Sequence, residues 1–321
     1  MNFFERLRNN PLIPHVAAEL PESAVQTARA LLAGGIDILE IPLGSAAGLE
    51  ALRAISAQVP EILVGGGGVF TIPQAKAVLD AGGEFILCPG FDPDLINWCG
   101  ENKLCVLPGC TSASELAAAA QLGLSVVSFS PANFCGGLAA MRALSAPFPG
   151  MKLIPSGGVT LENIGEYSAA LCVLTVGGDF VCGTDLISAG NFEKITELSK
   201  KAMFASLDFQ LRHIGINCNS DEEAISLAGR FENAFGFPKI DGGGSVFAGT
   251  EVEVMKRPFH GALGHIALLT SCADRALPFL IKKGLTPIED SLFYKDGRLF
   301  VVYFQEDFGG FAVHLLQKLA D

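Results

Sequence analysis

Short apolar runs alternate with helical stretches along residues 11–206. The apolar runs lie at 12–17, 36–41, 61–65, 84–88, 104–108, 124–129, 151–155 and 171–176. The stretches between them, such as ESAVQTARALLAGG and ASELAAAAQLG, space their apolar residues as helices do and end in glycine, a common helix stop. Eight strands that alternate with helices predict an α/β fold, in which a parallel sheet closes into a (β/α)8 TIM barrel over residues 1–206.

The pattern changes from Phe209 onward. The chain there reads RHIGINC, a helical stretch and VFAGTEVEVMKR, and the same order returns as GHIALLT, ADRALPFLIKKG, SLFYKDGRLFVVYFQED and GFAVHLLQK. Each half is interpreted as a strand, a helix and three strands, with an Asp-Gly hairpin in YKDGRLF. Residues 209–321 are therefore predicted to form an α+β domain of two βαβββ modules, after a boundary near residues 206–210.

Charge and composition narrow the classes of partner. The formal net charge of −12 argues against binding to nucleic acid or to an anionic membrane. The nine cysteines are scattered singly, as the buried thiols of a reducing compartment are. The N-terminal MNFFERLRNNPLIP is too polar for a signal peptide, and no run reaches the roughly 18 apolar residues of a membrane helix. We therefore expect a cytoplasmic protein without a nucleic-acid or membrane partner.

Candidate chemistry in the predicted barrel lies where the strands end. Active sites of such barrels sit at the C-terminal ends of the strands, and His15, Glu40 and Ser128 lie near the ends of the first, second and sixth strands. Glycine-rich turns follow the third, seventh and eighth strands. The last two turns, which contain Gly157–Gly158 and Gly177–Gly178, are where barrels of this kind often hold phosphate through backbone N–H groups.

Motifs along residues 1–206 resemble those of the Schiff-base aldolases that cleave 2-keto-3-deoxy-6-phosphogluconate and 4-hydroxy-2-oxoglutarate. The motifs occur in the order AGGIDILEIPL, VGGGGVF, CPGF, PGCTSASEL, FSPANFCGG, IPSGGV and GGDFV. The resemblance implies a carbon–carbon lyase that acts on small 2-oxo acids, needs no cofactor in the barrel and assembles as a homo-oligomer, usually a trimer.

Residue by residue, this resemblance implies an incomplete aldolase site. It places the family's proton-shuttling glutamate at Glu40 and the imine-forming lysine at Ser128, which is unable to form an imine. It places the carboxylate-binding arginine at Gly44, a threonine at Gly68, and a serine of the phosphate site at Asp179, whose charge would repel phosphate.

Three interpretations of the barrel stay open. The barrel is a relic kept for assembly or ligand binding, or it acts on an unphosphorylated oxo acid with Glu40 as the base, or it cleaves aldols slowly without an imine. No other lysine is expected to substitute, because Lys76 lies on a helix and Lys103 and Lys152 lie at the starts of strands. The residues assigned to the barrel site are Glu40 and Ser128 for catalysis and His15, Gly157, Gly158, Gly177 and Gly178 for substrate binding.

Four side chains after residue 212 have the chemistry of metal ligands. His213 and His265 open the two modules, and Glu253 and His314 hold matching places in their last strands. If the modules pack face to face, these four side chains converge on one ion. Imidazole and carboxylate groups suit Zn, Ni, Fe and Mn, so we predict a divalent metal site here. Glu251, on the same side of its strand as Glu253, is the alternative ligand.

This arrangement resembles the glyoxalase, or vicinal-oxygen-chelate, superfamily. The phrases GHIALLT and VVYFQEDFGGFAVHLL carry the likeness. The usual ligands of that superfamily are His, Glu, His and Glu, so His314 departs from the pattern and lacks the carboxylate that serves as a base in its isomerases. The resemblance implies an ion that acts as a Lewis acid on paired oxygens of an oxo acid or enediolate. His260 lies in a loop and is expected to be exposed.

Two enzymatic functions are compatible with the whole chain. The first is a carbon–carbon lyase of the aldolase family that acts on 2-oxo acids, with Ser128 in place of the lysine. The alternative is a metal-dependent isomerase, lyase or dioxygenase carried by residues 209–321, with the barrel as a scaffold. A third interpretation, a binding or regulatory protein, predicts neither a stoichiometric metal nor turnover of any oxo acid.

Overall fold

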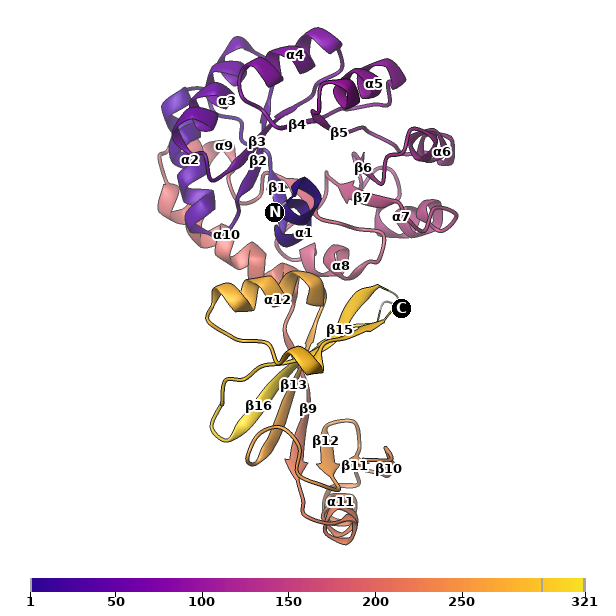
Figure 1. Cartoon of the computed structure of the whole chain (residues 1–321). Coiled ribbons are helices and arrows are strands. Elements are labelled where there is room, and N and C mark those ends of the chain that lie inside the picture. The colour runs from indigo at the N-terminus through magenta and orange to yellow at the C-terminus, as the bar shows by residue number, and fades with distance from the viewer. Residues whose placement is uncertain (1, 296, 320–321) are drawn as a thin grey trace. The chain divides into compact units, whose positions relative to one another are not determined.

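The computed structural model describes residues 2–295 and 297–319. The chain divides into two compact units, of which the first ends at Ser206 and the second begins at Leu207. This division lies in the region where the pattern of apolar residues changes. Each unit has its own helices and sheet (Figure 1).

The first unit is a closed barrel of eight parallel strands. The strands are β1 (Leu12–Pro14), β2 (Ile38–Pro42), β3 (Leu63–Gly67), β4 (Phe85–Leu87), β5 (Cys105–Leu107), β6 (Val126–Phe129), β7 (Lys152–Pro155) and β8 (Val176–Gly178). Ladders join β1 to β8, β2 through to β5, and β6 to β7, and single bridges join β1 to β2, β5 to β6 and β7 to β8. The predicted TIM barrel is confirmed for this unit.

Helices surround these strands (Figure 1). They are α2 (Pro21–Ala33), α3 (Ala46–Gln58), α4 (Ile72–Asp80), α5 (Pro93–Glu101), α6 (Ala113–Gln121), α7 (Gly137–Ser145), α8 (Ile164–Ala169), α9 (Thr184–Ser188) and α10 (Phe192–Leu207). Local sequence sets where some of them begin. Thr71 and Ser112 accept hydrogen bonds from the N–H groups of Gln74 and Glu115, whose side chains bond back to the capping residues of α4 and α6.

A short helix that the sequence pattern did not single out, α1 (Phe3–Asn9), lies at the N-terminal ends of the strands. Its Arg6 donates hydrogen bonds to the backbone carbonyls of Asp37 and Glu61, which precede β2 and β3. Because α1 lies at this end of the barrel, the opposite end, where the strands finish, is the end left for a ligand.

Two glycine segments that were expected as turns are parts of strands. Gly65–Gly67 lies within β3, and Gly177–Gly178 lies within β8, which begins at Val176 where the apolar run was expected to end. The physical reason in β3 is space: a Cβ on Gly65 would lie 2.6 Å from the ring of Phe85. Glycine here lets a bulky side chain of the next strand fill the barrel.

The second unit is built on one eight-stranded sheet. Its elements are β9 (Gln210–Asn217), α11 (Asp221–Phe235), β10 (Lys239–Asp241), β11 (Ser245–Ala248), β12 (Val252–Met255), β13 (Gly264–Thr270), α12 (Ala273–Lys282), the 3₁₀ turn Glu289–Ser291, β14 (Phe293–Lys295), β15 (Arg298–Tyr303) and β16 (Phe311–Gln317). The strand order is β10-β11-β12-β9-β13-β16-β15-β14. The order strand, helix and three strands thus occurs twice.

The two halves of this sheet meet edge to edge. β9 and β13 pair antiparallel at the centre, while β12 and β16 flank them in parallel. Packing face to face, which the sequence interpretation assumed, is therefore wrong, because backbone hydrogen bonds between β9 and β13 join the halves into one sheet. The hairpin of β14 and β15 has the expected antiparallel pairing, and Asp296 of its predicted turn lies outside the described residues.

Two expectations drawn from composition, on membrane-spanning helices and on the cysteines, can be compared with the described residues. No helix among them is both long and apolar enough to span a bilayer. The nine cysteines are free, as expected, and most are buried. Burial raises the pKa of the Cys88 and Cys110 thiols to about 12, so these groups stay protonated at neutral pH.

Removal of a barrel side chain should destabilise the first unit. Phe85 is fully buried, and Phe85→Ala should lower the free energy of unfolding by about 3–5 kcal/mol, because it leaves a cavity. Trp98, the single tryptophan of the chain, lies on α5 and reports the unfolding of this unit by fluorescence in a denaturant titration.

The matched control is Phe134→Ala, because the Phe134 side chain is 84% exposed. This variant should unfold within about 0.5 kcal/mol of the wild type. An equally small effect of Phe85→Ala would contradict the packing of the barrel interior.

Candidate functional site

Glu40 projects into the barrel. A Cβ on Gly66 would lie 2.5 Å from a methyl group of Val78 on α4, so Gly66 faces the outer helices. Because successive residues of a strand face opposite sides, Gly65 and Gly67 face the interior. Glu40 pairs with Gly65 in the β2–β3 ladder and therefore shares this inner face.

The pairing of residues between neighbouring strands shows that His15 and Ser128 also face the barrel interior. Laterally paired residues project to the same face of a sheet. The pairs that lead around the barrel are His15–Glu40, Glu40–Gly65, Gly65–Phe85, Phe85–Cys105, Gly109–Ser128, Ser128–Ile154, Ser156–Gly177 and Gly177–Ile13. The circuit closes because Ile13 precedes His15 by two residues. His15, Glu40 and Ser128 are thus brought to one inner surface.

His15 and Glu40 form a hydrogen-bonded pair at the strand ends. His15 Nδ1 lies 2.8 Å from Glu40 Oε1, with the His15 side chain 41% exposed and that of Glu40 mostly buried. The hydrogen bond raises the pKa of His15, partial burial opposes it, and the charges of Glu40 and Asp179 add to the rise. A Cβ on Gly67 would lie 1.6 Å from Glu40 Oε2, so Gly67 makes room for the carboxylate. The sequence analysis foresaw neither the pair nor Gly67.

Ser128 is 4% exposed, and its hydroxyl has no hydrogen-bond partner in the described part of the chain. The lysines considered as substitutes lie elsewhere. Lys152 is the first residue of β7 and donates to the backbone carbonyl of Leu171, Lys103 lies just before β5, and Lys76 lies on α4. Lys103 and Lys152 thus lie at the N-terminal end of the strands, and Lys76 lies on a surrounding helix. None of the three lies at the end of the strands where Ser128 lies.

Only one of the two predicted phosphate turns is a turn. Gly157 and Gly158 follow β7 with φ values of 84° and 83°, which favour glycine. Asn163 donates a hydrogen bond of 2.9 Å to the carbonyl of Gly158. Gly177–Gly178 instead continues β8, and the carbonyl of Gly178 accepts a hydrogen bond from the N–H of His15.

In the second unit, three of the predicted ligands share one face of the sheet. Gly215 of β9 pairs with Glu253 of β12 on one side and with His265 of β13 on the other. His213 lies two residues before Gly215, so its side chain projects to the same face. A Cβ on Gly215 would lie 2.1 Å from Cε1 of His265. The imidazole thus occupies the space that a larger residue would take.

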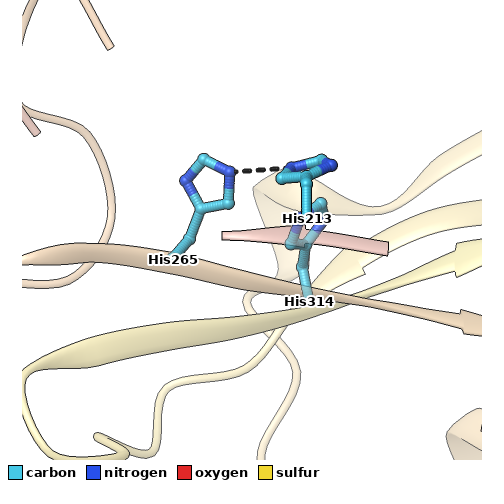
Figure 2. A group of neighbouring side chains, drawn as sticks. All are labelled: His213, His265 and His314. Carbon is cyan, nitrogen blue, oxygen red and sulfur yellow. Dashed lines mark hydrogen bonds between the residues drawn. The ribbon is translucent and has the colours of Figure 1, made fainter. Parts of the chain in front are cut away.

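His314 reaches the same face through the next strand. Ala267 of β13 pairs with His213 on one side and with His314 of β16 on the other. Figure 2 shows the three imidazoles close together above the strands. One potential ligand atom from each of His213, His265 and His314 lies within 4.8 Å of the other two.

Three atoms at the centre of this group form a triangle. His213 Nε2 and His265 Nε2 lie 3.1 Å apart, and each lies 3.1 Å from Glu253 Oε2. Ligand atoms about 2.0–2.2 Å from one ion lie about 2.8–3.6 Å apart in octahedral or tetrahedral geometry, so these separations fit shared coordination. Ser245 donates a hydrogen bond of 2.7 Å to Glu253 Oε1 and so orients the carboxylate.

Several buried nitrogens of this group lack a protein partner. His265 Nδ1 and both ring nitrogens of His314 make no hydrogen bond within the described chain. Leaving a buried polar atom unsatisfied costs about 1–3 kcal/mol. Burial, with the charges of His265 and His213, lowers the pKa of His314 to about 3. At neutral pH its imidazole is therefore uncharged, the form that binds metals.

The Glu253 carboxylate is ionised at neutral pH. Burial opposes its ionisation, but hydrogen bonds with His213, His265 and Ser245 outweigh burial and hold the pKa of Glu253 well below its usual range. The group thus offers one anionic oxygen beside the nitrogens of three imidazoles, a donor set suited to a divalent transition metal.

The remaining residues near this group differ from expectation. Glu251 accepts hydrogen bonds from Thr250 in the turn before β12 and does not belong to the cluster, so the alternative ligand assignment is wrong. His260 lies in a loop as expected but is only partly exposed, because its ring packs against that of Tyr303, with centroids 4.7 Å apart and planes tilted by 44°. Tyr303, which the sequence analysis missed, is stacked on His314 with ring centroids 4.3 Å apart.

The barrel has clear relatives. A family model for KDPG and KHG aldolase matches residues 4–198. The chain belongs to this aldolase family. It is 37% identical over 203 residues to the 2-dehydro-3-deoxy-phosphogluconate aldolase of Treponema pallidum, covering 63% of this chain and 97% of that protein. It is 34% identical over 197 residues to the KHG/KDPG aldolase of Escherichia coli K12, covering 61% of this chain and 92% of that protein.

Solved structures of aldolases agree with the fold. The KDPG aldolase of Legionella pneumophila, crystallised with pyruvate captured at low pH as a covalent carbinolamine intermediate, has a TM-score of 0.61 and 32% identity. That match covers 63% of this chain and 98% of that chain. The expected family is thereby confirmed for the first unit.

The His15–Glu40 pair should be visible in a titration. Glu40→Gln should lower the pKa of His15, because it removes the charged acceptor. NMR of the His15 ring against pH measures the shift, and Glu22→Gln on the exposed side of α2 is the control.

The same pair should contribute to stability in a defined pH range. Because folding raises the pKa of His15, the contribution is fully present below the unfolded value near 6.5 and is lost as pH rises through the raised value. A His15 titration that is identical in wild type and Glu40→Gln would contradict the pair.

Proposed function

We propose that the second unit holds a divalent metal ion through His213, Glu253, His265 and His314, and that this centre acts on a small acid with paired oxygens. The main support is the triangle of His213, His265 and Glu253 atoms at 3.1 Å, with the unpartnered His314 nitrogens beside it. A cluster of ligands on several strands is typical of functional metal sites.

The topology supports a glyoxalase-like interpretation of this unit. Each half of the sheet contributes one residue from its first strand and one from its last: His213 and Glu253, then His265 and His314. This is the distribution that the resemblance to vicinal-oxygen-chelate proteins implies. The family model covers residues 4–198, so the activity of the second unit is inferred from its own residues.

The residues of the chain define what such a centre would do. A bound Zn, Ni, Fe or Mn ion would supply Lewis-acid chemistry to the oxygens of a substrate. A divalent ion with the single carboxylate of Glu253 leaves a net positive charge, which favours a monoanionic oxo acid. The ring of Tyr303 packs against His314 and restricts its orientation. We therefore favour a metal-dependent isomerase, lyase or dioxygenase.

The metal content of the purified full chain tests this function. Wild type should carry about one equivalent of a divalent metal, as measured by inductively coupled plasma mass spectrometry. His265→Ala should weaken binding by more than about 100-fold, since changes to groups that only support the ligands already cost about 10–100-fold. Gly215→Ala should also weaken binding, because its methyl group would displace the His265 ring.

His260→Ala is the matched control for these variants, because His260 lies near the cluster but supplies none of its atoms. Circular dichroism establishes that each variant is folded. Undiminished metal content in folded His265→Ala protein, or wild type that binds no divalent ion, would rule out this function.

A second function, in the barrel, is supported by family membership and by Glu40 on the inner surface. We infer that the barrel acts on an unphosphorylated 2-oxo acid by lyase-class chemistry without an imine. The resemblance puts Ser128 at the lysine position, and the charge of Asp179 acts near His15, where it disfavours phosphate. A Cβ on Gly44 would meet nothing within 4 Å, so packing does not force the loss of the family's arginine there.

Reductive trapping tests the loss of the imine. Wild type treated with pyruvate and borohydride should show no covalent adduct by intact-protein mass spectrometry, because a hydroxyl group does not form an imine. Ser128→Lys should become trapped, since it restores an amine on the inner surface. Ser125→Lys, at the exposed opposite end of the same strand segment, is the control and should not react. Trapping of wild type would contradict the inference.

A further inference from the structure

The His15–Glu40 pair has the geometry of an oriented base. Glu40 Oε1 occupies the Nδ1 side of the imidazole at 2.8 Å. A carboxylate in this place fixes the tautomer with hydrogen on Nδ1, which leaves the lone pair on Nε2. His15 Nε2 makes no hydrogen bond within the described chain, and the side chain is 41% exposed. The ring therefore offers a free acceptor to a ligand at the strand ends.

Backbone hydrogen bonds hold the strand ends that carry this pair, and one glycine makes room for its carboxylate. The N–H of His15 donates to the carbonyl of Gly178 at 3.0 Å, and the N–H of Val16 donates to the carbonyl of Glu40 at 2.9 Å. These bonds fix the two strand ends that carry the pair. Gly67 of the third strand makes room for the carboxylate, because any Cβ there would overlap Glu40 Oε2. A rigid, oriented proton acceptor is what general base catalysis needs.

Two acidic groups act on the imidazole, and their charges favour its protonated product. Glu40 is in direct contact with His15, and the charge of Asp179, just after β8, also acts on it. An imidazolium formed when Nε2 accepts a proton is stabilised by both carboxylates. Of the two carboxylate oxygens of Glu40, Oε1 is engaged by His15 and Oε2 lies against the backbone of Gly67.

On this geometry we propose that His15, oriented by Glu40, is the proton-transferring residue of the barrel, and that it acts at carbon 3 of an unphosphorylated 2-oxo acid. This rests on the barrel function proposed above and changes the identity of the base from Glu40 to His15. Ser128 lies on the same inner surface as His15 and Glu40, and its hydroxyl group is able to donate a hydrogen bond to a ligand there.

The proton-transfer step balances without a co-reactant. His15 Nε2 accepts the proton from carbon 3, and the electron pair of that C–H bond forms the C2–C3 double bond. The C2–O π pair moves onto oxygen, which gives an enolate. The imidazolium then returns a proton to carbon 3 and restores the oxo acid. In D₂O the imidazolium exchanges with solvent first, so deuterium enters at carbon 3.

Pyruvate is the probe, because its methyl group is carbon 3 and its deuteration is read directly by proton NMR. The full chain as purified should accelerate loss of the methyl signal in D₂O above the protein-free rate. His15→Gln should lower the catalysed rate by about 100-fold or more, the usual contribution of a general base. Glu40→Gln should lower it less and shift its pH dependence toward lower pH, because the pKa of His15 falls. His260→Gln is the matched histidine control and should keep the wild-type rate.

Two added measurements separate the possible failures. Saturation-transfer NMR measures pyruvate binding by each variant, and the exchange rate is recorded with and without EDTA. Binding by wild type without exchange, or undiminished exchange by His15→Gln, overturns the role of His15 but leaves the barrel as a 2-oxo acid site. Exchange that EDTA abolishes assigns the reaction to the second unit and also overturns the proposal. If wild type does not bind pyruvate, both the proposed barrel function and the proposed role of the His15–Glu40 pair are overturned.

Discussion

Neighbouring strands of a sheet project laterally paired residues to the same side, and both candidate sites depend on this constraint. In the barrel, the bridge between β1 and β2 sets His15 directly beside Glu40, although 25 residues separate them. In the second unit, Gly215 at the centre of the sheet sets Glu253 and His265 on its two sides. A shift of one residue in either register would turn a functional side chain to the opposite face.

Glycine residues on the neighbouring strands leave the space that the side chains of both sites occupy. Gly67 lies under the Glu40 carboxylate, and Gly215 lies under the His265 imidazole. In each case a polar side chain from one strand extends over the backbone of the next strand, which is possible only where that strand lacks a Cβ. These glycines are not turn residues, and their φ values do not lie in the left-handed region. Their role is close approach, which is a different use of glycine from conformational freedom.

The two sites differ in how they treat charge. The His15 imidazole is partly exposed and faces carboxylates, so protonation is favoured there. The His314 imidazole is buried among other imidazoles, so protonation is disfavoured and one of its two ring nitrogens keeps a free electron pair. The same side-chain type thus has the role that we propose in proton transfer in one unit, and the role that we propose in metal coordination in the other. Burial and the sign of the nearest charges make the difference.

Strand and helix periodicity determined much of this protein from sequence alone. The alternation of apolar runs and helical stretches fixed the barrel, since burial on both sides imposes a near-continuous apolar pattern. The conspicuous histidines, His213 and His265, marked the second site because imidazole is rare and chemically distinctive. Glycine was the weak signal: the segments at Gly65–Gly67 and Gly177–Gly178 looked like turns but are strands. The sequence alone does not distinguish a glycine that a turn requires from a glycine that a crowded sheet requires.

Only the tertiary structure decided which residues meet. The closed circuit of strand pairs brought His15 to Glu40, and the β9–β13 pairing joined the two halves of the second unit edge to edge. It also excluded Glu251 from the cluster and added Tyr303 to it. Local sequence encodes the period of each strand, but register is set by hydrogen bonds and packing between strands that are distant in the chain. The chemistry of both sites depends on that register.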